Sequence, residues 1–282
     1  MDITPAELKQ AIEREDDFGH EMRIRKLLGR IPYLRYEHGG AYSDPFEEKP
    51  REYDFRCFVR GKQADRRLSL AIEGKNLDPD APLIISGTSR VARESFHEWI
   101  ASGYSGRMPY SVVKKRDKVD RLYPAGQFVG KSILRLKPNP EKKGEKLIRA
   151  RNDERDLSTQ WKQALTSAHD LCTKAALALQ EVPVGHSQPI LTMVLPILAV
   201  PDGSLWRMSY TEDGIGGGAP ETVDSIQYFV GWRVDGRTDW NTYSVHLTHL
   251  HFVTMTGLAN LLGSMHATSD IWEDWFSQEP PA

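Results

Sequence analysis

One helical pattern divides this sequence in two and constrains its fold more than any other feature. Between residues 157 and 180, apolar side chains recur every three or four positions, and Pro183 ends the pattern. The segments on both sides of it have strand-like composition, and shorter helical patterns stand near both ends of the chain. The order helix, strands, helix, strands, helix predicts a mixed α/β or α+β fold.

The strand candidates are rich in β-branched and aromatic residues and are separated by Gly, Asp and Pro turns. We expect strands at residues 33–37, 52–59, 67–76 and 82–86, and again at 190–200, 204–210, 226–234 and 243–253. Residues 5–29 are expected to form either one helix or two short ones divided at residues 16–19, and further helices are expected at 94–101 and 256–265. The later strands either extend the core sheet or form a small appended sheet.

Composition argues against a membrane protein and a secreted one. Hydrophobic residues make up 39% of the 282 residues, and no apolar run approaches the roughly 20 residues of a membrane-spanning helix. The N-terminal segment is charged from its second residue, unlike a signal peptide. Cys57 and Cys172 are too few for a disulfide framework, and we expect both to be buried. We therefore expect a cytoplasmic protein without a membrane partner.

Charge is distributed unevenly along the chain. The net charge is −2, but residues 107–151 contain fourteen Lys and Arg against four acidic residues. Such a segment is typical of contact with a polyanion, because neutralising phosphates dominates non-specific nucleic-acid binding. A solvated insertion is the alternative interpretation.

The strand at residues 68–75 carries the sharpest chemical pattern. Alternation places Leu68, Leu70 and Ile72 on one face, and Glu73 and Lys75 on the other. If the strand at 52–59 pairs with it as a hairpin, Asp54 comes within reach of both. Two carboxylates can bind Mg²⁺ while leaving coordination positions for water and a phosphate oxygen. A surface hairpin with an ordinary Glu and Lys is the alternative.

These motifs, in this order, resemble the PD-(D/E)xK nuclease superfamily, particularly its bacterial members. The resemblance rests on Asp54 after Tyr53, on Glu73-Gly74-Lys75 ending the next strand, and on the helix that carries Trp161-Lys162-Gln163. It covers roughly residues 15–200 and implies a restriction-endonuclease-like core, a central mixed β-sheet flanked by helices. Residues 1–200 would form this core, with a basic insertion at about 107–151. Residues 201–282 would form a C-terminal β-rich extension, with further strands and a helix, packed on the core.

The resemblance also implies roles for the motif residues. Asp54 and Glu73, with the backbone carbonyl of Gly74, would bind Mg²⁺ or Mn²⁺. Lys75 would position the attacking water for phosphodiester hydrolysis, which would leave 5′-phosphate and 3′-hydroxyl ends. The resemblance thus implies a metal-dependent endodeoxyribonuclease, with a setting in bacterial defence suggested by analogy of fold alone.

Two more residues belong to the expected site. Glu21, in the first helical region, would act on the metal through water or help to bind a second ion, and a solvated helix residue is its alternative. Gln163 would contact Lys75 or a phosphate. The main alternative function is a catalytically silent protein of the same fold that binds DNA or acts as a scaffold subunit. The sequence leaves open a homodimer or a partner subunit, and the choice between DNA and RNA.

Three other patterns predict no site of this kind. The glycine-rich segment at residues 214–219 fits the letters of a dinucleotide-binding motif, but no strand precedes it and Pro220 follows it, so we expect a loop. The histidines His246, His249 and His251 are expected on a strand or in the core, with a metal enzyme built on them as a weaker alternative. The aromatic segment at 271–276 is expected to pack on the chain's own sheet, with docking on a partner as its alternative.

Overall fold

The computed structural model describes most of the chain. The described residues are 3–61, 65–77, 81–105, 107–116, 120–138, 148–151, 154–177, 188–239, 242–267, 272 and 274–276. The elements, in chain order, are α1 (Pro5–Glu15), α2 (Phe18–Leu28), β1 (Leu34–Ser43), β2 (Pro50–Arg60), β3 (Arg66–Gly74), β4 (Leu83–Ser89), η1 (Ala92–Glu94), β5 (His97–Ser105), β6 (Met108–Arg116), β7 (Phe128–Pro138), β8 (Ile148–Arg151), α3 (Glu154–Leu177), β9 (Ile190–Val200), β10 (Leu205–Ser209), β11 (Glu221–Thr222), β12 (Ser225–Arg237), β13 (Thr242–Thr254), α4 (Met255–Ala267) and η3 (Asp274–Phe276).

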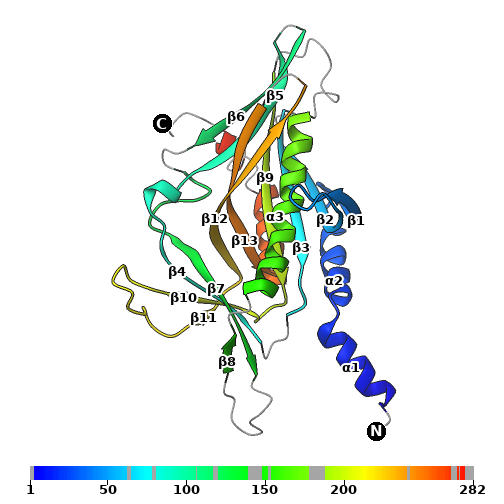
Figure 1. Ribbon diagram of the computed structural model, residues 1–282, viewed down its shortest axis with the longest axis vertical. Helices are drawn as coiled ribbons and strands as arrows, with labels where there is room; N and C mark the ends of the chain where they lie inside the picture. The colour runs from blue at the N-terminus through cyan, green and yellow to red at the C-terminus, as the bar shows by residue number, and fades with distance from the viewer. Residues whose placement is uncertain are drawn as a thin grey trace.

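A large mixed sheet organises the described residues, and helices lie on both of its faces (Figure 1). Strands β1, β2 and β3 form an antiparallel meander, and the chain then returns through α3 to β9, which is parallel to β3. Strand β13 pairs parallel with β9, and β12, β7, β4, β10 and β11 follow in that order. The expected mixed α/β class with a helix-flanked sheet is therefore confirmed.

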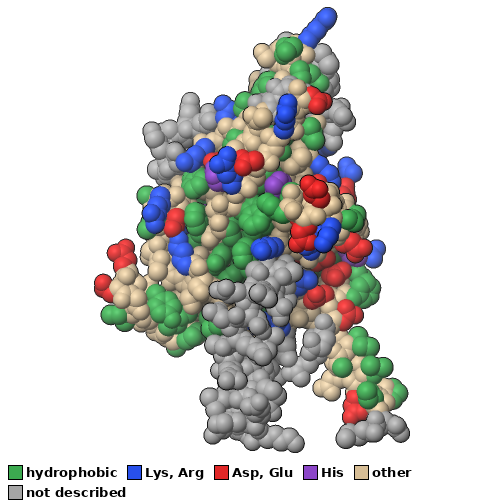
Figure 2. All heavy atoms as spheres, viewed as in Figure 1, with side chains coloured by type: hydrophobic (Ala, Val, Ile, Leu, Met, Phe, Trp, Pro, Cys, Tyr) green, Lys and Arg blue, Asp and Glu red, His purple; other side chains and the backbone are tan. Residues whose placement is uncertain are grey.

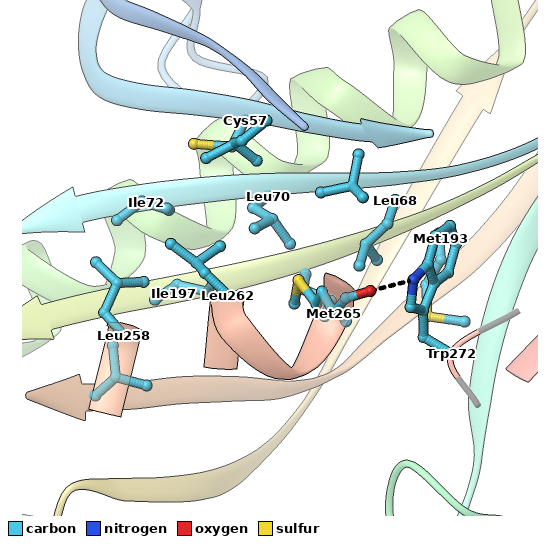
Figure 3. Close-up of a cluster of buried hydrophobic side chains, with 14 of the residues drawn as sticks. Cys57, Leu68, Leu70, Ile72, Met193, Ile197, Leu258, Leu262, Met265 and Trp272 are labelled. Atoms are coloured by element: carbon cyan, nitrogen blue, oxygen red, sulfur yellow. Dashed lines mark hydrogen bonds between the residues drawn. The ribbon is translucent and has the colours of Figure 1, made fainter. Parts of the chain in front are cut away.

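The two faces of the sheet contain separate groups of buried side chains. One face carries Leu68, Leu70 and Ile72 of β3, which pack with α2 and α4. Figure 3 shows part of this group, including the hydrogen bond that Trp272 Nε1 donates to the carbonyl oxygen of Met265 at 2.8 Å. On the other face, Ala71 packs with Leu165 and other residues of α3. Alternation along β3 thus sends Glu73 toward the α3 face.

The helix break near residue 17 follows from local hydrogen bonds. Helix α1 starts with a capping box, in which Thr4 Oγ1 accepts from the Glu7 N–H at 3.3 Å and the Glu7 carboxylate accepts from the Thr4 N–H at 2.9 Å. After α1 ends, Asp16 Oδ1 accepts the N–H of Phe18 at 3.0 Å, at the start of α2. Of the two alternatives for the first helical region, the structure has two short helices.

One predicted helix is wrong. Residues 94–101 were expected to be helical, but η1 covers only Ala92–Glu94, and β5 begins at His97. Strand β5 pairs with β6 along its length and with β9 at Ile100–Ser102, and Trp99 is buried. Tertiary pairing on two sides therefore overrides the helical spacing of this short segment.

The later strands are central to the sheet, because β13 lies beside β9 and β12 beside β13. The later strands therefore extend the core sheet and do not form a small appended sheet. The division into a core at residues 1–200 and a C-terminal extension at 201–282 packed on it stays a prediction. The described part of the basic segment forms β6, β7 and β8, while residues 139–147 lie outside the described residues. In the view of Figure 2, Lys and Arg side chains are scattered over the visible face and do not form one continuous surface.

Several smaller expectations are confirmed. Cys57 and Cys172 are free and buried. His249 and His251 are buried on β13, and the Tyr123 hydroxyl lies 2.9 Å from Nε2 of His251. Trp272 and Phe276 pack in the core, while residues 271 and 273 of the same segment lie outside the described residues. Residues 214–219 form an exposed loop between β10 and β11. No helix within the described ranges is long and apolar enough to span a membrane.

Two glycines of α4 provide a test of this packing. A Cβ at Gly257 would lie 1.9 Å from the carbonyl oxygen of Asp224, whereas one at Gly263 meets no atom within 4 Å. We expect Gly257→Ala to lower the free energy of unfolding by about 1–3 kcal/mol through overpacking. Gly263→Ala is its control and should raise the same free energy by about 0.5–1 kcal/mol, since alanine favours the helix. Urea unfolding measures both, and equal effects would contradict the packing described for α4.

Candidate metal and phosphodiester site

The antiparallel pairing of β2 and β3 brings Asp54 and Glu73 together. Phe55 of β2 pairs with Ile72 of β3. In this antiparallel register the adjacent pair is Asp54 and Glu73, and both of these side chains lie on the face of the sheet that α3 covers. Side chains at such neighbouring positions have Cβ atoms about 4.5–5.5 Å apart. Asp54 Oδ2 accepts the backbone N–H of Gly74 at 2.7 Å, which fixes the carboxylate at the end of the hairpin. The hairpin expected from the sequence therefore exists and carries both carboxylates.

Glu73 is the most unusual residue of the site. Its side chain is 0% exposed, and neither carboxylate oxygen has a hydrogen-bond partner of good geometry among the described residues. Burial, followed by the charge of Asp54, raises the pKa of Glu73 well above its usual value. Burial also raises the pKa of Asp54, partly offset by the Gly74 N–H. Two facing carboxyl groups of this kind need a proton or a cation between them.

Lys75 is close enough to affect both carboxyl groups. Its charge lowers the pKa of Asp54 and of Glu73, although less than burial raises them. Its Nζ donates to Asp17 Oδ2 at 3.0 Å, and only 17% of its side chain is exposed. The acidic partners, Asp17 foremost, outweigh burial and raise the pKa of Lys75, which keeps it protonated. The site therefore holds an ammonium beside two carboxyl groups.

Sequence reasoning missed Asp17. Its second oxygen, Oδ1, accepts the N–H of Asn76 at 2.7 Å, and Asn76 Nδ2 donates to the carbonyl oxygens of Glu13 and Asp16, both at 3.0 Å. The junction of α1 and α2 is thereby attached to the turn that follows Lys75. The signal was present, since Asp16-Asp17 was recognised as a helix break, but the pattern does not say what such a break contacts.

Removing the Asp17 carboxylate is a test of this attachment. We expect Asp17→Ala to lower the free energy of unfolding by about 1–3 kcal/mol, because the Asn76 N–H loses its acceptor and Lys75 loses its ion pair. Asp213→Ala, in the exposed loop between β10 and β11, is the control and should change it by less than about 0.5 kcal/mol. Urea unfolding distinguishes the two, and equal small effects would contradict a structural role for Asp17.

Glu21 and Gly74 meet at the opposite face of β3. A Cβ at Gly74 would lie 2.8 Å from Ile24 Cδ1 and 3.7 Å from Glu21 Cγ, so a larger residue there would require the Ile24 side chain to shift. Burial, followed by the charges of Asp54 and Asp17, raises the pKa of Glu21. His38 Nε2 lies 3.8 Å from Glu21 Oε2. The charge of Asp54 thus affects Glu21. The predicted role of Glu21 at a metal ion stays a prediction, and so does metal binding by the carbonyl oxygen of Gly74.

Gln163 does not contact Lys75 through any described hydrogen bond. Its Nε2 donates to the carbonyl oxygen of Glu52 at 3.0 Å, two residues before Asp54, so it connects α3 to β2. A contact of Gln163 with phosphate stays a prediction. Tyr42, which sequence reasoning missed, is close enough to Glu73 to be affected by its charge. Its hydroxyl lies 2.7 Å from Thr166 Oγ1, and burial, with a contribution from Glu73, raises the pKa of Tyr42 to about 12.

The donor set fits a hard divalent cation with few protein ligands. The described residues include no cluster of three or more His, Cys, Asp or Glu side chains with metal-binding geometry. Mg²⁺ needs no such cluster, since one or two carboxylates commonly hold it together with water and substrate phosphate. The fully buried carboxyl group of Glu73, whose pKa is raised by burial and by the adjacent Asp54, is the observation that supports the fit. Asp54 and Glu73 would therefore be the ligands.

Figure 2 shows acidic side chains gathered over β1, β2 and α2, the region that contains this site. Comparisons with protein-family models, with curated proteins and with solved structures find no match for this chain.

Proposed function

We propose that this protein is a Mg²⁺-dependent nuclease that hydrolyses phosphodiester bonds, most favourably of DNA. The observation that carries the proposal is the pair Asp54 and Glu73, in which the carboxyl group of Glu73 is fully buried next to Asp54 and near the ammonium of Lys75. A buried pair of carboxyl groups with raised pKa values is costly for folding alone and is typical of a functional site.

The connection of the elements supports the same proposal. The expected order was a helix with Glu21, the Asp54 strand, the E-x-K strand, a further strand at residues 82–86 and the later helix with Trp161. In the fold, α2, β2, β3, β4 and α3 follow in that order, with β1 between α2 and β2 and with η1 and β5 to β8 between β4 and α3. Helix α3 leads to β9, which is parallel to β3. We propose that these elements form a restriction-endonuclease-like core.

Each residue would have a distinct task. Asp54 and Glu73 would bind the cation from neighbouring strands, with Asp54 oriented by the Gly74 N–H. A bound divalent cation lowers the pKa of water and offsets charge on the phosphate. Lys75, held by Asp17, would orient the attacking water and stabilise negative charge on the phosphate oxygens. Gln163 would keep β2 in place against α3.

Cleavage of supercoiled plasmid and of single-stranded DNA and RNA tests the proposal. We expect wild-type protein to cleave with Mg²⁺ or Mn²⁺ and to be inactive with EDTA, while Asp54→Asn is inactive throughout. Asp213→Asn, far from the site in the exposed loop, should cleave like wild type. If wild type is inactive under every condition yet binds DNA with steep salt dependence, the non-catalytic alternative replaces this proposal.

A further inference from the structure

Helix α1 stands apart from the body of the protein. It extends away from the sheet in Figure 1, and it contributes to none of the groups of buried hydrophobic side chains in the described part of the chain. Its side chains from position 5 to position 13 are all exposed. Helix α2, by contrast, buries Ile24 and Leu28. The chain therefore builds a helix that is not packed on the sheet.

This helix and its two ends carry an exposed apolar surface. Leu8 and Ile12 are four residues apart, so they lie next to each other on one face of α1. Ile3 lies just before the helix and Phe18 just after it, and the four side chains are 50–76% exposed. Figure 2 shows hydrophobic side chains on the visible surface of this region. Large apolar side chains gathered on one short exposed segment are typical of an interaction surface.

The helix is held in place without use of its apolar face. An isolated helix of 11 residues is marginal in water, because helices shorter than about 12–15 residues rarely persist alone. The capping box at Thr4 stabilises the first turn, and Asn76 Nδ2 holds the last turn by donating to the carbonyl oxygen of Glu13 at 3.0 Å. Leu8 and Ile12 take part in neither contact. A partner can therefore pack on a helix that is already ordered, which lowers the entropic cost of association.

The charges beside the apolar face are complementary to a second copy of the same helix. Lys9 and Glu13 lie on the same flank of this face one turn apart, with Lys9 Nζ 3.7 Å from Glu13 Oε1. If two copies pack antiparallel about a two-fold axis, Lys9 of each copy lies beside Glu13 of the other, and Leu8 of each lies beside Ile12 of the other. A parallel pair would place like charges together. The charge pattern therefore favours a second copy in the antiparallel orientation.

The apolar residues at the two ends of α1 fit the same arrangement. In an antiparallel pair, the end of one helix that carries Ile3 lies at the end of the other that carries Phe18. Every contact then occurs twice, and the assembly closes with two copies. A helix of 11 residues is about 16 Å long, so the contact is smaller than the roughly 1,200 Å² of a standard stable interface. The dimer is therefore expected to be weak and reversible.

We propose that α1 is the contact surface of a weak homodimer, in which two copies of the helix pack antiparallel through Leu8 and Ile12. The proposal does not depend on the proposed nuclease function, because the contact uses neither Asp54, Glu73 nor Lys75.

Sedimentation velocity of the full chain tests the dimer. We expect wild type to change from monomer to dimer between about 1 and 500 µM, with a dissociation constant of about 10–100 µM, as suits a contact at the low end of interface size. Leu8→Gln and Ile12→Gln should each raise this constant at least about tenfold, since each variant removes apolar contacts at two places in the dimer. Ile215→Gln is the matched control, because Ile215 is also a largely exposed apolar residue but lies in the loop between β10 and β11.

Charge reversal tests the antiparallel orientation. Lys9→Glu and Glu13→Lys should each weaken the dimer about threefold, because each variant leaves charges of one sign on the flank. An equimolar mixture of the two variants should form dimers more tightly than either alone, since opposite charges then meet across the pair. Circular dichroism shows whether each variant keeps its helices.

Three results would overturn the proposal. A wild-type chain that stays monomeric at about 500 µM would mean that α1 binds another partner or none. Dimers of Leu8→Gln and Ile12→Gln as tight as those of Ile215→Gln would place the contact elsewhere on the surface. A mixture of the charge variants that associates no better than either alone would contradict the antiparallel pair. These results do not depend on whether the chain cleaves DNA.

Discussion

Lys75→Ala is expected to lower the rate of DNA cleavage by about 10²–10⁴-fold, the range typical of a group that positions a proton transfer or stabilises charge in the transition state. The ammonium lies beside Asp54 and Glu73 and is held by Asp17 at 3.0 Å, so its loss removes the positive charge nearest to the two carboxyl groups. Single-turnover cleavage of plasmid at saturating Mg²⁺ measures the effect.

Lys49→Ala is the control for this variant. Lys49 also lies near an acidic residue, with its Nζ 4.0 Å from Glu47, but on the exposed turn between β1 and β2. Its replacement should leave the cleavage rate within about twofold, since exposed ion pairs contribute little. Thermal unfolding of both variants shows whether they are folded. A folded Lys75→Ala protein that cleaves like Lys49→Ala would contradict the role given to Lys75.

Glu73→Gln is expected to have opposite effects on activity and stability. Cleavage should fall by at least about 10³-fold, because the amide replaces a metal-binding carboxylate, while the folded protein becomes more stable above neutral pH. The raised pKa of Glu73 means that the folded chain keeps a proton that the unfolded chain releases above about pH 4.5. The stability of wild type should therefore fall as pH rises from about 4.5 through the raised pKa.

Glutamine has no charge to bury, so the variant should not show this loss. We expect it to exceed wild type by about 1–3 kcal/mol at pH 8 and to differ less at pH 5. Mg²⁺ should raise the melting temperature of wild type at pH 8 and leave that of Glu73→Gln unchanged. Urea unfolding at the two pH values provides the measurement, with Glu212→Gln in the exposed loop as the control. The same pH dependence in wild type and Glu73→Gln would contradict the buried carboxylate pair.

Much of the site followed from periodicity. Alternation along residues 68–75 was enough to separate Leu68, Leu70 and Ile72 from Glu73, and hairpin pairing then placed Asp54 opposite. The sequence could not indicate what Asp17 or Tyr42 contacts, because each reaches the site through a tertiary contact. Asp17 does so from the end of α1 and Tyr42 from β1, under α3. Contacts between distant segments have no local signal.

The same limit explains the errors in the fold. The segment at residues 94–101 is short, and its pairing with β9, almost a hundred residues later, decides that it is a strand. The position of β13 beside β9 likewise depends on pairing between strands more than forty residues apart. Long helices such as α3 were predictable, since their apolar stripe repeats over many turns.

The central claim is that Asp54 and Glu73 together bind a divalent cation, and calorimetric titration of the DNA-free protein with Mn²⁺ at pH 8 tests it most directly. We predict that wild type binds Mn²⁺, and that Asp54→Asn and Glu73→Gln each weaken binding by at least about tenfold, the lower limit seen even for groups that only support metal ligands. Asp213→Asn should bind like wild type. Mn²⁺ binding that is absent in wild type, or unchanged in both site variants, would contradict the claim.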